Sequence, residues 1–179
     1  CDWSRTRFTM DKDLSKAVIK VFVDLYSNKL IYKDKKLVNW DTQLQTAISD
    51  LEVVQKEVQS KLYYIDYSIV NSNQKITIAT TRPETMMGDT AVAVNPKDKR
   101  YINLIGKKVQ IPLVNRTVKI ISDHYADPEQ GTGAVKITPA HDFNDYEVGQ
   151  RNKLEIINIL EKNGKINKNG IKEFCGLDR

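Results

Sequence analysis

Residues 62–80, LYYIDYSIVNSNQKITIAT, predict a pair of antiparallel strands. Aromatic and β-branched residues dominate both halves of this stretch, and these residue types are enriched in strands. The polar residues 71–74 between the halves are typical of a turn. We therefore expect one strand over 65–70 and a return strand over 75–80.

Further short strands follow along the chain, separated by turn residues. A helical turn is expected from Pro83 to Met87, because proline suits the first helical position. A helix is expected over 142–152, with Asp142 near its N-terminus. Irregularly spaced strands with few helices predict an α+β fold, a mixed domain with a barrel-like sheet. The predicted strands cover 90–94, 109–114, 117–121, 134–138 and 156–160.

The first 50 residues have a different pattern. Apolar residues recur at helical spacing at 14, 18, 21, 22 and 25, which predicts a helix with Thr9 as its N-cap. Residues 30–40 predict a hairpin whose turn lies at 33–35. We therefore divide the chain into a helix-and-hairpin flank, 1–55, and a barrel-like domain, 56–179.

The composition of the 179 residues narrows the class of protein. Lys and Arg total 28 against 23 Asp and Glu, and the net charge of +5 permits a nucleic-acid partner without requiring one. The two histidines, and the two cysteines at opposite ends of the chain, show no metal-ligand spacing, so we expect no metal. No apolar run reaches the roughly 18 residues that a membrane span needs. We therefore expect no membrane contact and a reduced, cytoplasmic setting.

A first polar stretch that suits ligand binding is TTRPETMMGD, residues 80–89. It follows a predicted strand and opens a helical turn. Hydroxyls and free backbone N–H groups at such a position suit an anionic or ester-bearing ligand. An ordinary capped turn explains the same residues equally well.

The second such stretch is GTGAVKITPA, residues 131–140. Two glycines around a threonine let the backbone approach a ligand closely. Lys136 and Thr138 point to one face of the predicted strand, because side chains alternate with period two. From these residues alone, a solvent-exposed face is slightly favoured over the wall of a polar pocket.

The third stretch is HDFNDYE, residues 141–147. Asp142 and Asp145 share a helix face, where two carboxylates can bind a primary ammonium. Each such charge-assisted hydrogen bond contributes about 1.5–3 kcal/mol. Helix capping by Asp142, with Asp145 complementing the helix dipole, is the alternative. We interpret His141 as a structural histidine rather than a base.

Together these stretches resemble the editing domain of class I aminoacyl-tRNA synthetases of the valyl type. The family's His-x-Gly-His and Lys-Met-Ser-Lys-Ser motifs are absent from the chain. The resemblance therefore implies an insertion domain with its flank, without the ATP-binding aminoacylation site. Gln130 departs from the bulky apolar residue that the family often carries, which affects one wall of the pocket. The residues that carry the resemblance occur in the family's order: 1–5, 37–41, 44–50, 80–85, 131–133 and 139–147.

The resemblance implies hydrolysis of threonine from mischarged tRNA(Val), an aminoacyl-tRNA deacylase reaction that needs no cofactor. An apolar synthetic site for valine rejects the nearly isosteric threonine only about 100-fold. A second site that hydrogen-bonds the threonine hydroxyl discriminates further, because valine leaves its polar groups unpaired at a cost of about 1–3 kcal/mol each. The implied partners are the threonine-charged acceptor end of tRNA(Val) and the remainder of the synthetase.

The implied catalytic residues are Asp145, Asp142, Lys136 and Thr138. By the resemblance, Asp145 holds the α-ammonium with support from Asp142, whereas Lys136 and Thr138 read the side-chain hydroxyl. The residues implied in substrate binding are Thr80, Thr81, Arg82, Glu84, Thr85, Gly131, Thr132, Gly133, Val135 and His141.

No residue in these stretches looks like an activated nucleophile, so we expect a positioned water to attack the ester. Two alternatives stay open. One is a tRNA-acceptor binding module without hydrolysis of its own. The other is an isoleucyl-type editor that clears valine.

Overall fold

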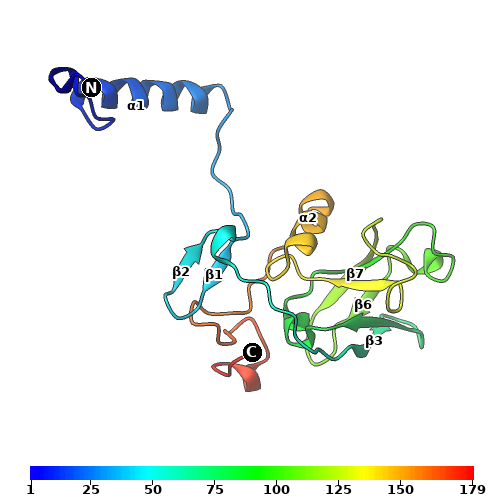
Figure 1. The fold of residues 1–179 in the computed structure, drawn as a ribbon. Helices are drawn as coiled ribbons and strands as arrows, with labels where there is room; N and C mark the ends of the chain where they lie inside the picture. Colours follow the sequence, from blue (N-terminus) through cyan, green and yellow to red (C-terminus); the bar gives the residue numbers. More distant parts are fainter. The chain divides into compact units, whose positions relative to one another are not determined.

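The computed structural model describes residues 1–179 and divides them into two compact units, 1–36 and 37–179 (Figure 1). None of its helices combines the length and the apolar character that crossing a membrane requires. Residues 1–55 were predicted to form the flank, but those from 37 onward lie in the second unit. There the Trp40 indole donates to the Lys162 carbonyl (2.8 Å), which ties this segment to the C-terminal part of the chain.

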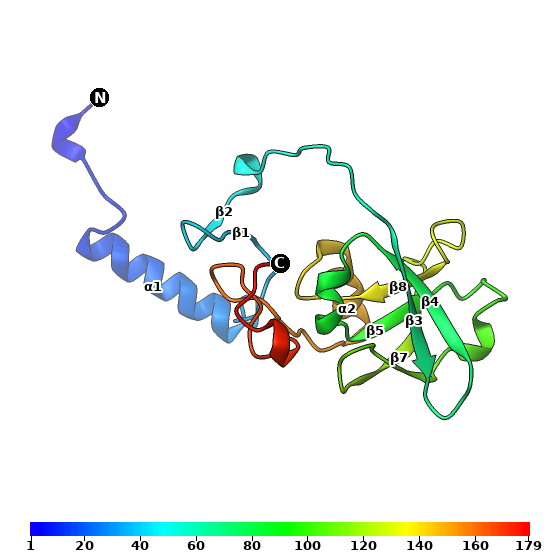
Figure 2. The same ribbon diagram turned by 90° about the horizontal axis from the view of Figure 1, so that it is seen from below.

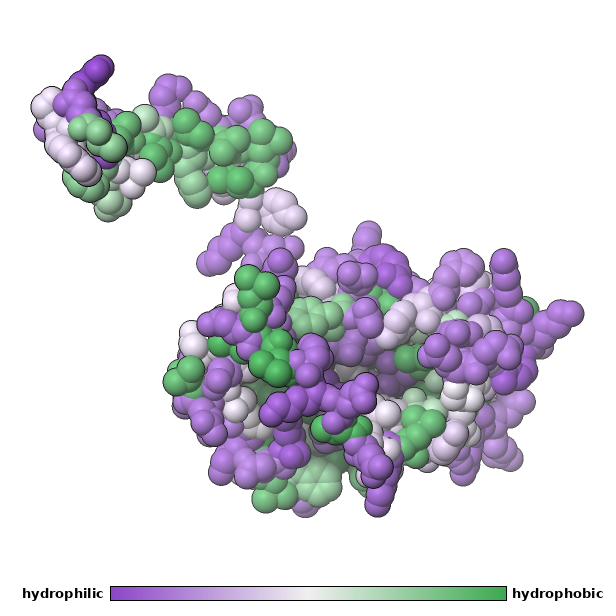
Figure 3. All heavy atoms as spheres, viewed as in Figure 1, coloured by the Kyte–Doolittle hydropathy of each residue, from purple (hydrophilic) through white to green (hydrophobic).

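The first unit contains a short 3-10 helix, η1 (Trp3–Arg5), and the α-helix α1 (Lys12–Ser27). The predicted helix is confirmed, but Thr9 is not its N-cap. The helix begins after Asp11, whose carboxylate accepts a hydrogen bond from the Phe8 amide (3.1 Å) and none from the helix itself. No residue of α1 is buried, and apolar side chains form much of its surface (Figure 3). The first unit therefore provides no packing partner for the apolar face of α1.

The second unit begins with a small antiparallel hairpin of β1 (Asn39–Asp41) and β2 (Thr46–Ile48). The Asp41 side chain accepts hydrogen bonds from two amides of the turn at 42–45 (both 2.8 Å). The hairpin predicted over 30–40 is therefore wrong. The chain turns where the Asp41 carboxylate satisfies the turn amides, and not at the lysine-rich segment before it.

A six-stranded sheet forms the body of the second unit (Figure 2). Its strands lie in the order β4-β3-β6-β7-β5-β8, and β4 also lies close to β8, so the sheet is a nearly closed barrel. The pair β5 and β7 is parallel, and the other neighbours are antiparallel. The predicted α+β fold with a barrel-like sheet is confirmed. The strands are β3 (Tyr63–Ile69), β4 (Lys75–Thr80), β5 (Ala91–Val94), β6 (Lys108–Gln110), β7 (Thr117–Ser122) and β8 (Ala134–Ile137).

The hairpin predicted at 62–80 is confirmed as β3 and β4. Its register runs from Tyr63 opposite Thr80 to Ser68 opposite Lys75. Alternate side chains of the strands point into the barrel, as the period of two requires. The barrel interior is filled by buried residues that include Tyr67, Ile69, Ile76, Ile78, Val92, Val94, Val109, Ile111 and Ile120.

The helix α2 (Phe143–Asn152) follows β8 and packs on the sheet through the buried Val148. The predicted helix is confirmed, and Asp142 is its N-cap, since Oδ1 accepts hydrogen bonds from two amides of the first turn (2.9 and 3.1 Å). At the other end, Arg151 donates to both carboxylate oxygens of Asp123 (2.7 and 2.8 Å). These contacts hold both ends of α2 against the barrel.

Four 3-10 helices complete the second unit, and one of them confirms the helical turn predicted at Pro83. That helix, η3, lies between β4 and β5 and is buried over its last four residues. The four are η2 (Asp50–Glu52), η3 (Pro83–Gly88), η4 (Ile102–Leu104) and η5 (Lys172–Phe174).

The strand predicted over 156–160 is wrong, because only an isolated bridge between Leu160 and Ile166 forms there. Side chains replace a neighbouring strand in this segment. The His141 Nε2 atom accepts from the Ile159 amide (3.1 Å), and the Asn167 side-chain amide donates to the carbonyl of residue 158 (3.1 Å). The Ile159 amide and the Asn158 carbonyl therefore bond to side chains, and the Ile159 carbonyl accepts from the Asn167 backbone amide (2.8 Å), without a regular ladder.

Candidate functional site

A cavity of about 380 Å³ lies among the end of β4, η3, β8 and the N-terminus of α2. It is lined by most of the residues that the sequence analysis selected. The three exceptions are Glu84, Thr132 and Gly133. The lining residues among those predicted are Thr80, Thr81, Arg82, Thr85, Gly131, Val135, Lys136, Thr138, His141, Asp142 and Asp145.

The three exceptions have structural contacts elsewhere. Glu84 accepts a hydrogen bond from Arg82 Nε (3.2 Å), so it orients that guanidinium. The Thr132 carbonyl accepts from the Tyr101 hydroxyl (2.8 Å). Gly133 adopts φ +79°, and a Cβ there would lie 2.5 Å from the Arg100 guanidinium, so glycine is required for the turn before β8.

The segment after β4 is fixed by hydroxyl and guanidinium hydrogen bonds. The Thr80 hydroxyl accepts from the Arg82 amide (3.1 Å), and the Thr85 hydroxyl donates to the Arg82 carbonyl (2.9 Å). Arg82 Nη1 donates to the His141 carbonyl (2.8 Å) and so links this segment to the loop before α2. Two polar stretches far apart in the sequence thereby form one wall of the cavity.

Lys136 is buried, with 6% of its surface exposed, and so faces the inside of the protein. The preference for a solvent-exposed face, drawn from the residues alone, is wrong. Its ammonium lies 2.7 Å from the Thr85 hydroxyl, 2.6 Å from the Thr138 hydroxyl and 3.5 Å from Asp89 Oδ1. Because an ammonium has three protons, these three oxygens satisfy it completely.

Asp89 is the fully buried carboxylate that balances Lys136, and the sequence analysis gave it no role. It accepts hydrogen bonds from the hydroxyls of Thr138 and Tyr67 (both 2.6 Å). Burial raises the pKa of Asp89, and this outweighs the opposing effect of Lys136 and the two hydroxyls. Burial also raises the pKa of Tyr67, so its hydroxyl stays protonated and donates. The signal available in the sequence was its place at the end of the 80–89 stretch, two residues before the apolar run 91–94.

This network determines what the cavity wall presents to a ligand. Thr138 gives its hydroxyl proton to Asp89, and Thr85 gives its own to the Arg82 carbonyl. Each hydroxyl accepts one hydrogen bond from Lys136, and a hydroxyl oxygen has two lone pairs. The wall therefore has unused acceptors and no unused donor among these groups, which suits a ligand that donates a hydrogen bond.

Asp145 lies in the first turn of α2 and is buried against the same cavity. Its Oδ2 atom accepts from the Thr138 amide (2.8 Å). Burial raises the pKa of Asp145 to about 6, against the lowering effect of that amide and of Lys136, while Asp142 and Asp89 add to the rise. At neutral pH the carboxylate is mostly charged, in a place where a cationic ligand relieves its desolvation.

Asp142 and His141 have structural contacts as well as a place on the cavity wall. Asp142 uses Oδ1 as the cap of α2, as the alternative interpretation predicted. His141 accepts through Nε2, and burial, followed by the charges of Arg82 and Lys136, lowers its pKa to about 4. The imidazole is therefore neutral at neutral pH and fits the structural interpretation.

Several lining residues were not predicted. Gln130, which the resemblance had placed at one wall, does line the cavity. Of the unpredicted residues, Ala134 follows the glycine turn, Leu62 precedes β3 and Ala79 lies in β4, so their proximity follows from segments already selected. The remaining two, Tyr125 and Asp127, lie in a loop after β7 whose sequence has no periodic pattern, and no sequence signal pointed to them. No group of three or more His, Cys, Asp or Glu side chains is arranged to hold a metal ion.

The geometry can be compared with known proteins. Residues 1–162 match the family model described as tRNA synthetases class I (I, L, M and V). The chain belongs to the class I tRNA synthetase family. Valine–tRNA ligase from Pelagibacter ubique is 70% identical over 179 residues, which are all of this chain and 20% of that protein. Valine–tRNA ligase from Bradyrhizobium diazoefficiens is 62% identical over 171 residues, 92% of this chain and 18% of that protein.

This class I synthetase chain thus spans about 20% of the length of the ligases that it matches. The predicted resemblance to synthetases of the valyl type is confirmed. Among solved structures, LeuRS from Agrobacterium radiobacter in a ternary complex with tRNA and LeuAMS has a TM-score of 0.48 and 21% sequence identity. That alignment covers 84% of this chain and 29% of the LeuRS chain.

Proposed function

We propose that this chain is an editing domain that hydrolyses the threonyl ester of mischarged tRNA(Val), as part of a valine–tRNA ligase. The observation that carries the proposal is a single cavity in which Asp145 lies near hydroxyl oxygens with unused lone pairs. A carboxylate suits the α-ammonium of an aminoacyl ester, and acceptor oxygens suit a side chain that donates. Threonine has both groups, whereas valine lacks the hydroxyl.

Asp145 binds the α-ammonium in this proposal. It is the buried carboxylate on the wall, and its raised pKa reflects a desolvated charge without a full set of partners. A charge-assisted hydrogen bond to an ammonium is worth about 1.5–3 kcal/mol. Asp142, at the cap position one turn away, adds a second negative charge that attracts the ammonium.

The oxygens of Thr85 and Thr138 accept the hydrogen bond of the threonine hydroxyl. Lys136 has no free proton with which to reach the ligand, because its three partners are all within the protein. Its role is to orient the two hydroxyls so that their remaining lone pairs meet the ligand. Valine would leave these oxygens unpaired, which costs about 1–3 kcal/mol per group.

Arg82 serves the ester end of the substrate. Its guanidinium uses one donor on Glu84 and one on the His141 carbonyl, and three of its five donors remain. These donors can stabilise the negative charge that develops on the ester carbonyl oxygen as water attacks. Thr81 lies beside Arg82 on the same wall and helps to position the ester or the water.

The test is to incubate the chain with threonyl-tRNA(Val) and with valyl-tRNA(Val) and to measure the release of each amino acid. We expect release of threonine and retention of valine. Release of valine alone would favour an isoleucyl-type editor, and binding without hydrolysis would favour an acceptor-binding module.

Two substitutions on α2 sharpen this experiment. Asp145→Asn should lower the rate on threonyl-tRNA(Val) about 10- to 150-fold, the loss of one charge-assisted hydrogen bond. Glu147→Gln removes an exposed carboxylate from the same helix and should change the rate by less than about twofold. Equal rates for the two variants would remove Asp145 from the site.

The partners follow from the same proposal. The threonine-charged acceptor end of tRNA(Val) is the substrate, and the reaction takes place in the cytoplasm. The remainder of the ligase is the second partner, and the exposed apolar face of α1 supports this, because the first unit leaves it without a packing partner.

A further inference from the structure

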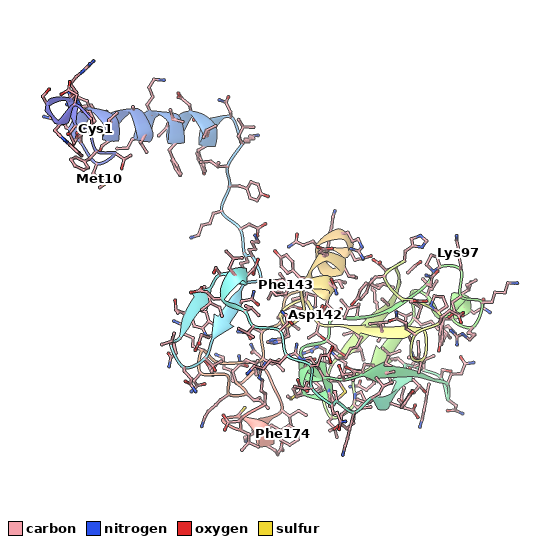
Figure 4. All side chains as sticks on the ribbon, viewed as in Figure 1. Cys1, Met10, Lys97, Asp142, Phe143 and Phe174 are labelled. Atoms are coloured by element: carbon pink, nitrogen blue, oxygen red, sulfur yellow. The ribbon has the colours of Figure 1, made fainter.

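The carboxylates at the start of α2 cannot satisfy a primary ammonium by themselves. An ammonium has three N–H groups and so needs three acceptors. Asp145 uses Oδ2 for the Thr138 amide, and Asp142 uses Oδ1 as the helix cap. Figure 4 shows Asp142 where α2 begins. Each carboxylate has one further oxygen, so the two provide at most two acceptors, and the third must come from another element.

Tyr125 brings a hydroxyl to this end of the cavity from the loop after β7. It lines the cavity together with Asp142 and Asp145. Burial raises the pKa of Tyr125, and the charges of Asp145 and Asp142 add to the rise, against a hydrogen bond from the Asn144 side chain. The hydroxyl therefore stays protonated at neutral pH and lies within electrostatic range of both carboxylates. Its oxygen has two lone pairs, and Asn144 uses one, so one acceptor position remains.

The backbone of Tyr125 is held against α2 by one buried carboxylate, that of Asp123. Asp123 accepts from the Tyr125 amide (2.9 Å), from the Asn152 side chain (2.8 Å) and twice from Arg151 (2.7 and 2.8 Å). The hydrogen bonds from Arg151 are the main reason why the pKa of Asp123 is lowered to about 2, so this carboxylate is charged at neutral pH. Tyr125 is thereby fixed to the helix that carries Asp145, and a hydroxyl fixed in advance binds a ligand at a smaller cost in entropy.

The charges at this end of the cavity favour a cation. Asp127, from the same loop as Tyr125, is a third carboxylate on the lining, beside those of Asp142 and Asp145. The nearby ammonium of Lys136 already has three oxygen partners within the protein. A ligand group that is positively charged and donates several hydrogen bonds therefore fits here, whereas a neutral amide supplies neither the charge nor enough N–H groups.

We propose that Tyr125 is a further specificity-determining residue, whose hydroxyl oxygen accepts the third hydrogen bond of the substrate's α-ammonium beside Asp145 and Asp142. This inference rests on the proposed function, since it takes the ligand to be an aminoacyl ester. It narrows the substrate class to esters with a free, protonated α-amine. An ester whose amine is acylated, as in a peptidyl-tRNA, has a single N–H and no charge there, and the site rejects it.

The experiment compares threonyl-tRNA(Val) with its N-acetyl derivative, which differs only at the amine. For the unsubstituted chain, kcat/KM on the N-acetyl ester should be at least about tenfold lower, because the charge-assisted hydrogen bonds are lost. Tyr125→Phe removes only the hydroxyl of a ring that is 36% exposed, so the fold should be retained. It should lower kcat/KM on threonyl-tRNA(Val) about 10- to 150-fold, the loss of one hydrogen bond to a charged group. On the N-acetyl ester it should stay within about twofold of the unsubstituted chain.

Tyr146→Phe is the matched control. It removes a phenol hydroxyl from α2 that accepts from the Gln150 side chain (3.0 Å), and Tyr146 does not line the cavity. This variant should stay within about twofold on both esters. Equal losses on both esters for Tyr125→Phe, or no loss on threonyl-tRNA(Val), overturn the inference. Activity that is lost in Tyr125→Ala but kept in Tyr125→Phe also overturns it, because the ring and not the hydroxyl would then be used.

Failure of the proposed function gives a different result. If the chain hydrolyses no threonyl ester, binding is measured with adenosine that carries threonine through an amide bond, and with the N-acetyl form of that compound. Tyr125→Phe must then weaken binding of the free-amine compound at least about tenfold and leave the N-acetyl form within about twofold. Equal dissociation constants of the two compounds for the unsubstituted chain, or no measurable binding of the free-amine compound, overturn the inference.

Discussion

Replacing Asp145 by asparagine separates the cost of a buried charge from its use in binding. The pKa of Asp145 is about 6 instead of the ordinary 3.8, mainly because burial disfavours the charged form. The folded protein therefore holds this proton more tightly than the unfolded chain does. The resulting penalty is absent below pH 3.8, grows as pH rises to about 6 and reaches about 3 kcal/mol at pH 7. A neutral asparagine side chain would escape this penalty, and its carbonyl oxygen can still accept from the Thr138 amide.

Urea unfolding followed by circular dichroism measures the effect at two pH values. Asp145→Asn should raise the free energy of unfolding by up to about 3 kcal/mol at pH 7 and by only about 1 kcal/mol at pH 4.5. His141 acts in the opposite direction, because a group with its pKa lowered to about 4 stays neutral when folded and loses stability as pH falls below 6.5. That contribution is the same in both proteins and cancels in their difference.

Asp142→Asn is the matched control for this prediction. It removes a carboxylate from the same helix end but keeps the cap, since Asn and Asp cap helices equally well, so stability should change by less than about 0.5 kcal/mol. The reasoning would be refuted if Asp145→Asn raised the free energy of unfolding equally at both pH values, or lowered it at pH 7. In the unsubstituted chain the same titration predicts that kcat/KM for threonyl-tRNA(Val) falls by up to tenfold per pH unit below about 6.

Three further substitutions test the packing around the site. Lys136→Met should lower the free energy of unfolding by about 3–5 kcal/mol, because Asp89 is left as an unpaired buried charge. Adding Asp89→Asn should recover at least half of that loss. Additive losses of the two substitutions in urea unfolding would contradict the pairing. Tyr67→Phe removes the hydroxyl 2.6 Å from Asp89 and should cost about 1–3 kcal/mol, so an unchanged Tm would count against this hydrogen bond. Gly149→Ala should cost about 1–3 kcal/mol in a thermal melt, because its Cβ would lie 2.8 Å from Pro139, and a stabilised helix would show that this contact relaxes freely.

Elements with a strong local pattern could be predicted from the sequence. The β3–β4 hairpin has branched and aromatic residues on both sides of a polar turn, and α2 begins at a side chain that caps it. The segment at 156–160 has an equally apolar pattern but forms no strand. The Ile159 amide and the Asn158 carbonyl bond to the side chains of His141 and Asn167, which no local pattern predicts.

The candidate site, too, could be predicted only in part from the sequence. The polar stretches identified most of the residues that line the cavity, because each stretch is polar where a scaffold strand would be apolar. Asp89 was left without a role, since its partners are Tyr67, 22 residues earlier, and Lys136, 47 residues later. Only the nearly closed barrel brings these three residues together.

The enclosed pairing of Lys136 and Asp89 also constrains how this protein can change over generations. Substitution of either residue alone leaves an unpaired buried charge and destabilises the protein, so we expect the two positions to change only together. Gln130 at the rim has no such partner and can be exchanged singly. Natural variation in substrate preference should therefore accumulate around the mouth of the pocket while its interior stays fixed.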